Sequence, residues 1–283
     1  MKKMSKVLKK KETKNEEGIY DKRNKINNLT GKEWLKLTKS VWTSKRSAID
    51  KDAFAHPAPF LLEDVRKLVR FFTKSDDTVA DIFMGSGTSV IAACLEGRFG
   101  LGIDLNRKYC SLARRRLKKL KIAKTKFEII QGDALEKLKK IKSIDYCVTS
   151  PPYHNILQNK GEGVRHDGSQ KRQGVEFYSE KTNDVGNQKT YQGFLKAVEK
   201  IMSLVHKKLK DKKYCSIIIS DFTVNKKEKN VHGDIIVLMQ KIGFEFSGTT
   251  ILVQDSKPLY PFGYPYAYKI NHHHQYILNF RKV

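Results

Sequence analysis

The residues of this chain best suited to chemistry form a pentapeptide: Thr149, Ser150, Pro151, Pro152 and Tyr153. It follows an apolar run that is typical of a buried strand. Prolines have no N–H to donate and fix φ, so the chain must leave the strand here in a stiff turn. A rigid turn that presents a hydroxyl and an aromatic ring suits the binding of a flat, polar ligand. The simpler alternative is a proline turn that only ends a strand.

A second candidate site is the glycine-rich stretch at 81–89, with the sequence DIFMGSGTS. Residues 78–80 before it are typical of a strand, and residues 90–95 after it of a helix. Gly85 and Gly87 allow the backbone to approach a ligand closely. The free N–H groups at the start of the helix suit a carboxylate or a phosphate. Strand, glycine turn and helix together predict a site for a nucleotide-like ligand.

Strands and helices alternate along the chain around these two motifs. The hydrophobic patterns predict strands at 78–81, 99–104, 127–133, 144–149, 214–221, 244–253 and 275–280, and helices at 60–73, 87–97, 106–122, 191–209 and 231–241. This alternation indicates a parallel sheet with helices on both faces. Ligands bind such sheets at the carboxyl ends of the strands, so both motifs line one cleft if the strands before them are neighbours. On helix 106–122 we expect a solvated basic face made of Arg114, Arg115, Arg116, Lys118 and Lys119.

An acidic residue, Asp104, ends the second predicted strand. In βαβ units of this kind an acid at that place binds a ribose diol. The alternative is that Asp104 caps the helix that follows. Its position a little under 20 residues after the glycine stretch favours the ribose.

Composition indicates a nucleic-acid partner. The chain has 283 residues with 56 Lys and Arg against 30 Asp and Glu, a formal charge of +26. Such an excess predicts a polyanionic partner, most simply nucleic acid. No apolar run reaches the ~18 residues of a membrane span. The four cysteines are scattered without a C-x-x-C pair, so we expect reduced thiols in a cytoplasmic protein.

Two long segments are candidates for nucleic-acid contact. Segment 154–190 is polar and basic, with the candidate contact residues Lys160, Arg165, Lys171, Arg172, Phe177 and Tyr178. Segment 255–272 carries aromatic residues on a proline-stiffened loop, which either stack on bases or cap the core. It runs into three consecutive histidines at 272–274. Adjacent residues of an extended chain point to opposite faces, so we expect no metal site there.

Both motifs resemble those of DNA amino-methyltransferases that act on N4 of cytosine or N6 of adenine. The glycine stretch is similar to the D-P-F-x-G-S-G-T-T signature of that family, with Ile82 in place of proline and Ser89 in place of threonine. The pentapeptide looks like the SPPY form of the family's base-gripping motif. The resemblance covers about residues 31–281. The familiar order places the PPY motif first, so the order here is permuted.

The resemblance implies a class I, Rossmann-like α/β fold with a seven-stranded, mostly parallel sheet and an antiparallel last strand. It implies S-adenosylmethionine as cofactor. The cofactor would be bound by His56, Pro57, Asp81, Phe83, Gly85, Ser86, Gly87, Thr88, Asp104, Leu105, Asp133 and Ala134. The amino group would be held and the base stacked by Ser150, Pro151, Pro152 and Tyr153. Apart from the resemblance, residues 1–30 are lysine-rich and poor in apolar residues, so we expect a flexible basic arm there, with or without a role in DNA contact. Residues 31–283 would be a single catalytic domain.

The implied function is methylation of double-stranded DNA, on N4 of cytosine, in a restriction–modification system with a cognate endonuclease as a further partner. Ser150 favours cytosine because adenine enzymes more often have Asp or Asn at that position. Three alternatives stay open: N6-adenine methylation, methylation of an RNA base, and a non-catalytic nucleic-acid-binding protein. The intact glycines, acids and SPPY residues disfavour the last of these.

Overall fold

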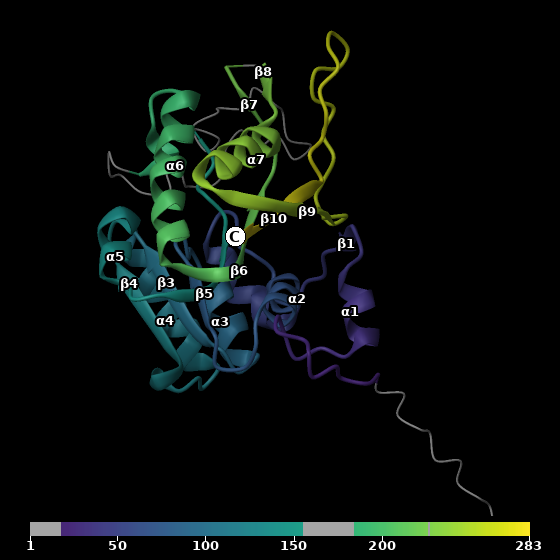
Figure 1. Ribbon diagram of the computed structural model, residues 1–283. Coiled ribbons are helices and arrows are strands. Elements are labelled where there is room, and N and C mark those ends of the chain that lie inside the picture. Colours follow the sequence, from purple (N-terminus) through teal and green to yellow (C-terminus); the bar gives the residue numbers. More distant parts are fainter. Residues whose placement is uncertain (1–17, 155–183, 226) are drawn as a thin grey trace, which may run out of the picture.

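An eight-stranded mixed sheet forms the centre of the computed structural model, which describes residues 18–154, 184–225 and 227–283 (Figure 1). Its strand order is β1-β9-β10-β6-β5-β2-β3-β4. The strands are β1 (Val41–Thr43), β2 (Thr78–Asp81), β3 (Phe99–Asp104), β4 (Phe127–Gln131), β5 (Ile144–Thr149), β6 (Leu209–Ile219), β9 (Phe244–Val253) and β10 (His274–Lys282). A separate antiparallel hairpin pairs β7 (Phe222–Val224) with β8 (Lys227–Lys229).

The sheet confirms the expected α/β class. From β6 through β5, β2 and β3 to β4 all neighbours are parallel, and β10 is antiparallel to β6 and β9. All seven predicted strands are present. The eighth, β1, was not predicted, because three residues are too few to show an alternating pattern. It is added at the edge beside β9, where Ser44 N donates to the Val253 carbonyl (2.8 Å).

Helices cover both faces of the sheet, as the alternation predicted (Figure 1). One face packs on α2, α3 and α4, and the other on α5, α6 and α7. On β5 the alternation is direct, since Tyr146 and Val148 join the first layer and Cys147 the second. The helices are α1 (Gly31–Leu37), α2 (Leu62–Phe72), α3 (Thr88–Leu95), α4 (Arg107–Lys119), α5 (Ala134–Lys140), α6 (Tyr191–Lys208) and α7 (Val231–Ile242), with 3-10 turns η1 (Ala48–Ala55), η2 (Lys124–Lys126) and η3 (Val185–Asn187).

The described part of the N-terminal region lies against the domain. Asn27 Nδ2 donates to the Phe71 carbonyl (2.6 Å), and Leu29 is buried. A capping box between Thr30 and Glu33 then starts α1. Asn27, which we had included in the flexible arm, therefore contacts α2, and Leu29 of the same segment is buried. Residues 1–17 of the expected arm lie outside the described residues.

Candidate active site at the carboxyl edge of the sheet

The glycine-rich loop connects β2 to α3 in a conformation that only glycine adopts easily. Gly85 has φ of +52° and Gly87 φ of +79°. A Cβ on Gly87 would lie 2.5 Å from the Ala113 Cβ of α4. A Cβ on Gly85 would lie 2.9 Å from the Nε2 of His56. The two glycines therefore let the loop pack between α4 and the segment that contains His56.

A buried arginine supports this loop from behind. Arg116 Nη1 donates to the Ser86 carbonyl (2.7 Å) and to Thr88 Oγ1 (2.9 Å), and Nη2 donates to the Ile49 carbonyl of η1 (3.5 Å). Only 2% of Arg116 is exposed, and burial lowers its pKa. We had expected Arg116 on the solvated face of α4, and this was wrong. Arg114 and Arg115 next to it are exposed. Residues three and four apart share a helix face, so an arginine run is not limited to one side.

Asp81 joins the two motifs. Its carboxylate accepts hydrogen bonds from the Thr149 hydroxyl (2.7 Å), from the Ser89 hydroxyl and from the Phe83 N–H (3.1 Å). Thr149 ends β5 and begins the SPPY turn, whereas Phe83 and Ser89 lie on either side of the glycines. Asp81 is 1% exposed, and burial raises its pKa to about 6. The carboxylate thus ties the glycine loop to the SPPY turn across neighbouring strands.

Asp104 ends β3 and holds the glycine loop from the other side. Its carboxylate accepts hydrogen bonds from the N–H of Gly85 (2.7 Å) and from the N–H of Asn106 (2.7 Å). Burial raises the pKa of Asp104 to about 6, with smaller contributions from the charges of Asp81 and Asp184. Asp104 is not the cap of the next helix, because the Asn106 side chain accepts from Lys108 N in that role. Leu105 between them is partly exposed.

Asp133 follows β4 and is the N-cap of α5, where it accepts from Leu135 N (2.9 Å). We had not predicted α5, since only seven residues separate Asp133 from its end and four of them are charged. Ala134 is buried beside it. The N–H of Gly132 donates to the Asp104 carbonyl (2.9 Å), so the ends of β3 and β4 lie together.

His56 lies directly over the glycine loop. Its ring meets the Tyr109 ring edge-on, with 4.4 Å between centroids. The Ala58 N–H donates to its Nδ1 (3.2 Å), which leaves the proton of the neutral ring on Nε2. Burial lowers the pKa of His56 to about 4, so the ring is neutral at pH 7. Pro57 after it is exposed.

The SPPY turn emerges beside this loop at the same edge of the sheet. Pro151 is buried, and Ser150, Pro152 and Tyr153 are partly exposed. The Tyr153 ring packs edge-on against Phe222 with 5.7 Å between centroids, and Gln275 Nε2 donates to its hydroxyl (3.0 Å). Burial raises the pKa of Tyr153. The ring is therefore fixed from two sides, as a stacking platform requires.

A short turn that we did not predict packs on the SPPY residues. In η3, a Cβ on Gly186 would lie 3.3 Å from the Pro152 Cβ and 3.5 Å from the Tyr153 carbonyl oxygen. Asp184 begins this turn by accepting from Gly186 N (2.8 Å), and its charge contributes to the raised pKa of Asp104. Asp184 lies within a long polar segment without hydrophobic periodicity, so the sequence did not indicate this turn. The six expected contact residues of this segment, from Lys160 to Tyr178, lie outside the described residues.

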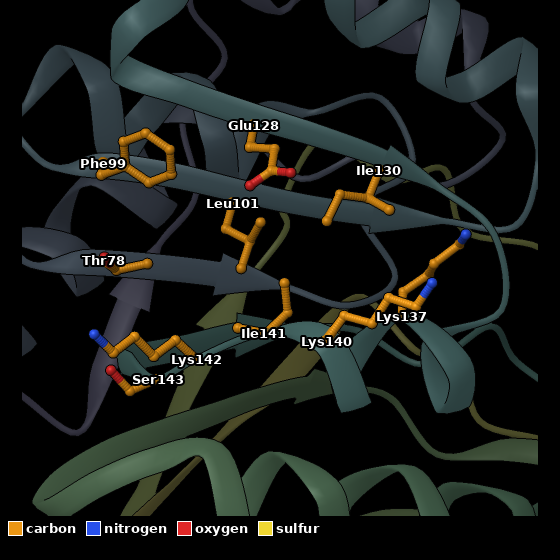
Figure 2. Close-up of a pocket in the computed structure, with 10 residues that line it drawn as sticks. All are labelled: Thr78, Phe99, Leu101, Glu128, Ile130, Lys137, Lys140, Ile141, Lys142 and Ser143. Carbon is orange, nitrogen blue, oxygen red and sulfur yellow. The ribbon is translucent and has the colours of Figure 1, made fainter.

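A surface pocket of about 440 Å³ opens elsewhere, on the sheet face beside α5 (Figure 2). It is lined by residues of β2, β3 and β4, by α5 and by the loop that follows α5. Thr78 and Phe99 begin their strands, whereas both motifs follow strand ends. None of the predicted site residues lines this pocket, so we do not assign it to the chemistry.

Two features of the described residues concern other functions, membrane insertion and metal binding. No helix in the described ranges is long and apolar enough to cross a membrane. Within the same ranges, no group of three or more His, Cys, Asp or Glu side chains is placed to hold a metal ion. The histidines at 272–274 are not part of such a group. His272 Nε2 is 2.7 Å from the Glu228 carboxylate, and the ring centroids of His273 and His274 are 6.2 Å apart.

Together the sheet and the loops at its carboxyl edge define a class I S-adenosylmethionine-dependent methyltransferase fold. A solved structure with this fold, TrmN from Thermus thermophilus, aligns with a TM-score of 0.51 and 13% identity over 83% of this chain and 52% of that one. The sequence profile of the DNA methylase family, N6_N4_Mtase, matches residues 2–115 and 144–283. The chain belongs to that DNA methylase family, and S-adenosylmethionine is its cofactor.

Curated relatives match over shorter stretches. The type II methyltransferase M.BglI of Bacillus subtilis is 31% identical over 124 residues, which are 44% of this chain and 32% of that protein. The orphan methyltransferase M.BamHII of Bacillus amyloliquefaciens is 38% identical over 74 residues, 26% of this chain and 28% of that protein. The matched stretches span about a third or less of these relatives' length.

Proposed function

We propose that this chain transfers the methyl group of S-adenosylmethionine to the exocyclic amino group of a base in double-stranded DNA, on N4 of cytosine. The observation that carries the proposal is the Asp81 carboxylate, which joins the glycine loop to the SPPY turn through Ser89 and Thr149. A cofactor loop and a base-gripping turn joined in this way present two ligands to each other at one edge of the sheet. Membership of the DNA methylase family supports the same reaction class.

The residues at the edge fit the cofactor in kind. Gly85 and Gly87 bring backbone close to the ligand, and the carboxylate of Asp104 stands at the strand end where a ribose diol is bound. In the proposal His56 and Pro57 contact the methionine end, and Asp133 with Ala134 the adenine. Asp81, Ser86 and Thr88 are buried, so we assign them to the shape of the loop rather than to side-chain contact with the ligand. The remaining proposed contacts are Phe83 and Leu105.

The chain's own residues would activate the amine. An exocyclic amine is a poor nucleophile because its lone pair is delocalised into the ring. Ser150 Oγ and the Pro151 carbonyl oxygen accept hydrogen bonds from the two N–H groups of the amine and draw its nitrogen toward tetrahedral geometry. Pro152 stiffens the turn, and Tyr153 stacks on the base, which must leave the helix to reach this edge. When bound, S-adenosylmethionine would supply an electrophilic methyl group and leave as S-adenosylhomocysteine, and the methylated nitrogen would then lose one proton to solvent. The fixed orientation of the two ligands would supply most of the rate.

Cytosine is the proposed target because of Ser150. A serine hydroxyl accepts a hydrogen bond from the amine and can still donate a hydrogen bond to a neighbouring acceptor, whereas an ionised aspartate only accepts. The alternative target is N6 of adenine. We further propose a cognate restriction endonuclease as a functional partner, and contact with DNA by segments 154–190 and 255–272.

The test is the identity of the methylated base. The chain is incubated with methyl-labelled S-adenosylmethionine and genomic DNA from cells that lack the gene, and the DNA is digested to nucleosides and separated. We expect label in N4-methyldeoxycytidine. Label in N6-methyldeoxyadenosine would contradict the base and leave amino-methylation standing. Label in total RNA and none in DNA, in a parallel incubation, would contradict DNA as the substrate.

A further inference from the structure

The connection between β9 and β10 rises from the same edge of the sheet as the SPPY turn. β9 is antiparallel to β10, and β10 is antiparallel to β6, which runs parallel to β5. The end of β9 and the start of β10 therefore lie at the carboxyl edge, where Thr149 ends β5. Figure 1 shows the connecting segment in yellow, extending well beyond the ends of the two strands. We call residues 255–272 the aromatic loop.

The base of the aromatic loop is joined to the site by hydrogen bonds. Gln254 Nε2 donates to Gln275 Oε1 (3.0 Å), and Gln275 Nε2 donates to the hydroxyl of Tyr153 (3.0 Å). The Gln254 N–H also donates to the His273 carbonyl (2.7 Å), which closes the loop at its base. Tyr153 is the ring proposed to stack on the target base. The loop thus stands beside the place where a base would leave the helix.

The loop has a defined shape. The Asn271 side chain crosses it, accepting from Tyr260 N (2.9 Å) and donating to the Tyr260 carbonyl (2.8 Å). At its tip the N–H groups of Tyr266 and Ala267 both donate to the Gly263 carbonyl (2.7 Å each). Gly263 has φ of +79°, and a Cβ there would lie 2.2 Å from the Ala267 carbonyl oxygen. The turn therefore requires glycine, and these hydrogen bonds define the path of its backbone.

Three tyrosines of this loop are almost wholly exposed. Tyr264 is 81% exposed, Tyr266 94% and Tyr268 91%. Rings with this exposure do not cap the core, which leaves base stacking of the two roles predicted from sequence. The aromatic loop has one acidic residue, Asp255 at its base, and two lysines, Lys257 and Lys269. An aromatic surface with a net positive charge, in a chain of net charge +26, complements nucleic acid better than it complements another copy of this basic chain.

We propose that the aromatic loop binds DNA next to the target base, and that Tyr264, Tyr266 and Tyr268 stack on bases left unpaired when the target base leaves the helix. This inference rests on the proposed function in taking DNA as the ligand. Tyrosine suits the task because its ring is large and loses little conformational freedom on binding. Stacking of one ring on a base changes affinity by about fivefold or more.

The experiment compares two triple variants, one with Tyr→Ser and one with Tyr→Phe at 264, 266 and 268. The control is Tyr20→Ser, an exposed tyrosine in the N-terminal region. Affinity is measured by fluorescence anisotropy for a labelled single-stranded 20-mer DNA of mixed sequence and for its duplex, across a range of salt concentrations. Thermal unfolding and S-adenosylmethionine titration are run on the same preparations.

We expect the Ser variant to lose at least about tenfold in affinity for single-stranded DNA. The Phe variant and the control should bind as the unchanged chain does. The slope of affinity against salt should be the same in all, because no phosphate contact is removed. Equal affinity of the Ser variant, or an equal loss in the Phe variant, would overturn the proposal. A chain that binds DNA through these rings but transfers no methyl group would refute the proposed function and leave this inference standing.

Discussion

Replacing Arg116 should weaken S-adenosylmethionine binding although Arg116 need not touch the ligand. Its guanidinium donates to the Ser86 carbonyl and the Thr88 hydroxyl, and both acceptors are buried. A hydrogen bond from a charged group contributes about 1.5–3 kcal/mol. Arg116→Met removes both bonds, and with them the longer bond to the Ile49 carbonyl, while keeping much of the volume. The fraction of molecules with the loop in its binding form falls, and the apparent affinity falls by the same factor.

The loss of one such bond corresponds to about 10- to 150-fold in affinity. We therefore expect the S-adenosylmethionine Kd of Arg116→Met to rise at least about tenfold in calorimetry. The free energy of unfolding should fall by less than the ~3–6 kcal/mol that two such bonds contribute, since removal of a buried charge offsets part of the lost bonding. Arg116→Lys, which keeps the charge and one donor group, should give an intermediate Kd.

The matched control is Arg114→Met. Arg114 lies on the same helix and donates to the Ile129 carbonyl of β4 (2.8 Å), away from the glycine loop. Its replacement should leave the Kd within about twofold of the unchanged chain. If the two Met variants bound S-adenosylmethionine equally well, the support of the loop by Arg116 would be refuted. Comparing the change in the S-adenosylmethionine Kd with the change in the free energy of unfolding separates this role from a general effect on folding.

The carboxylates of Asp104 and Asp81 give two further predictions. Asp104→Ala should raise the S-adenosylmethionine Kd at least about tenfold, because it removes the bond to Gly85 N and, with it, the proposed ribose contact. Unchanged calorimetric affinity would make Asp104 a purely structural residue. Burial raises the folded-state pKa of Asp81 from 3.8 to about 6, so its contribution to stability is fully present below about pH 4 and is lost as the pH rises through 6. Urea unfolding from pH 4 to 6.5 should show a shallower fall in stability for Asp81→Asn than for the exposed control Asp76→Asn, and parallel curves would show that the pKa of Asp81 is not raised.

The sequence predicted the parts of the fold that repeat along the chain. Residues 78–81, 99–104 and 144–149 were predicted as strands and form β2, β3 and β5 with these bounds. β2 and β3 end at Asp81 and Asp104, and β5 runs into a serine and two prolines, which have no N–H to donate to a strand. The sequence did not predict the elements that lack such a pattern. β1 has three residues, and α5 is short and mostly charged.

The supporting contacts of the site depend on tertiary packing, which a single sequence does not show. Arg116 looks like its exposed neighbours Arg114 and Arg115, and only the approach of the glycine loop makes it a buried donor. Asp81 was expected at the cofactor because of its motif. The structure adds the hydrogen bond that the Thr149 hydroxyl donates to Asp81 from 68 positions further along the chain. The motifs therefore predicted the candidate site, whereas the hydrogen bonds that join the motifs could be seen only in the fold.

The central claim is that Ser150 holds the amine that receives the methyl group. In the transition state the amine nitrogen gains positive charge, so its bond to Ser150 becomes charge-assisted. Loss of such a bond slows transfer by about 10- to 150-fold. The direct measurement is methyl transfer to unmodified DNA by Ser150→Ala, with Ser75→Ala, an exposed serine, as control. We predict transfer slowed by that factor with unchanged S-adenosylmethionine affinity. Equal transfer rates in both variants would contradict the claim.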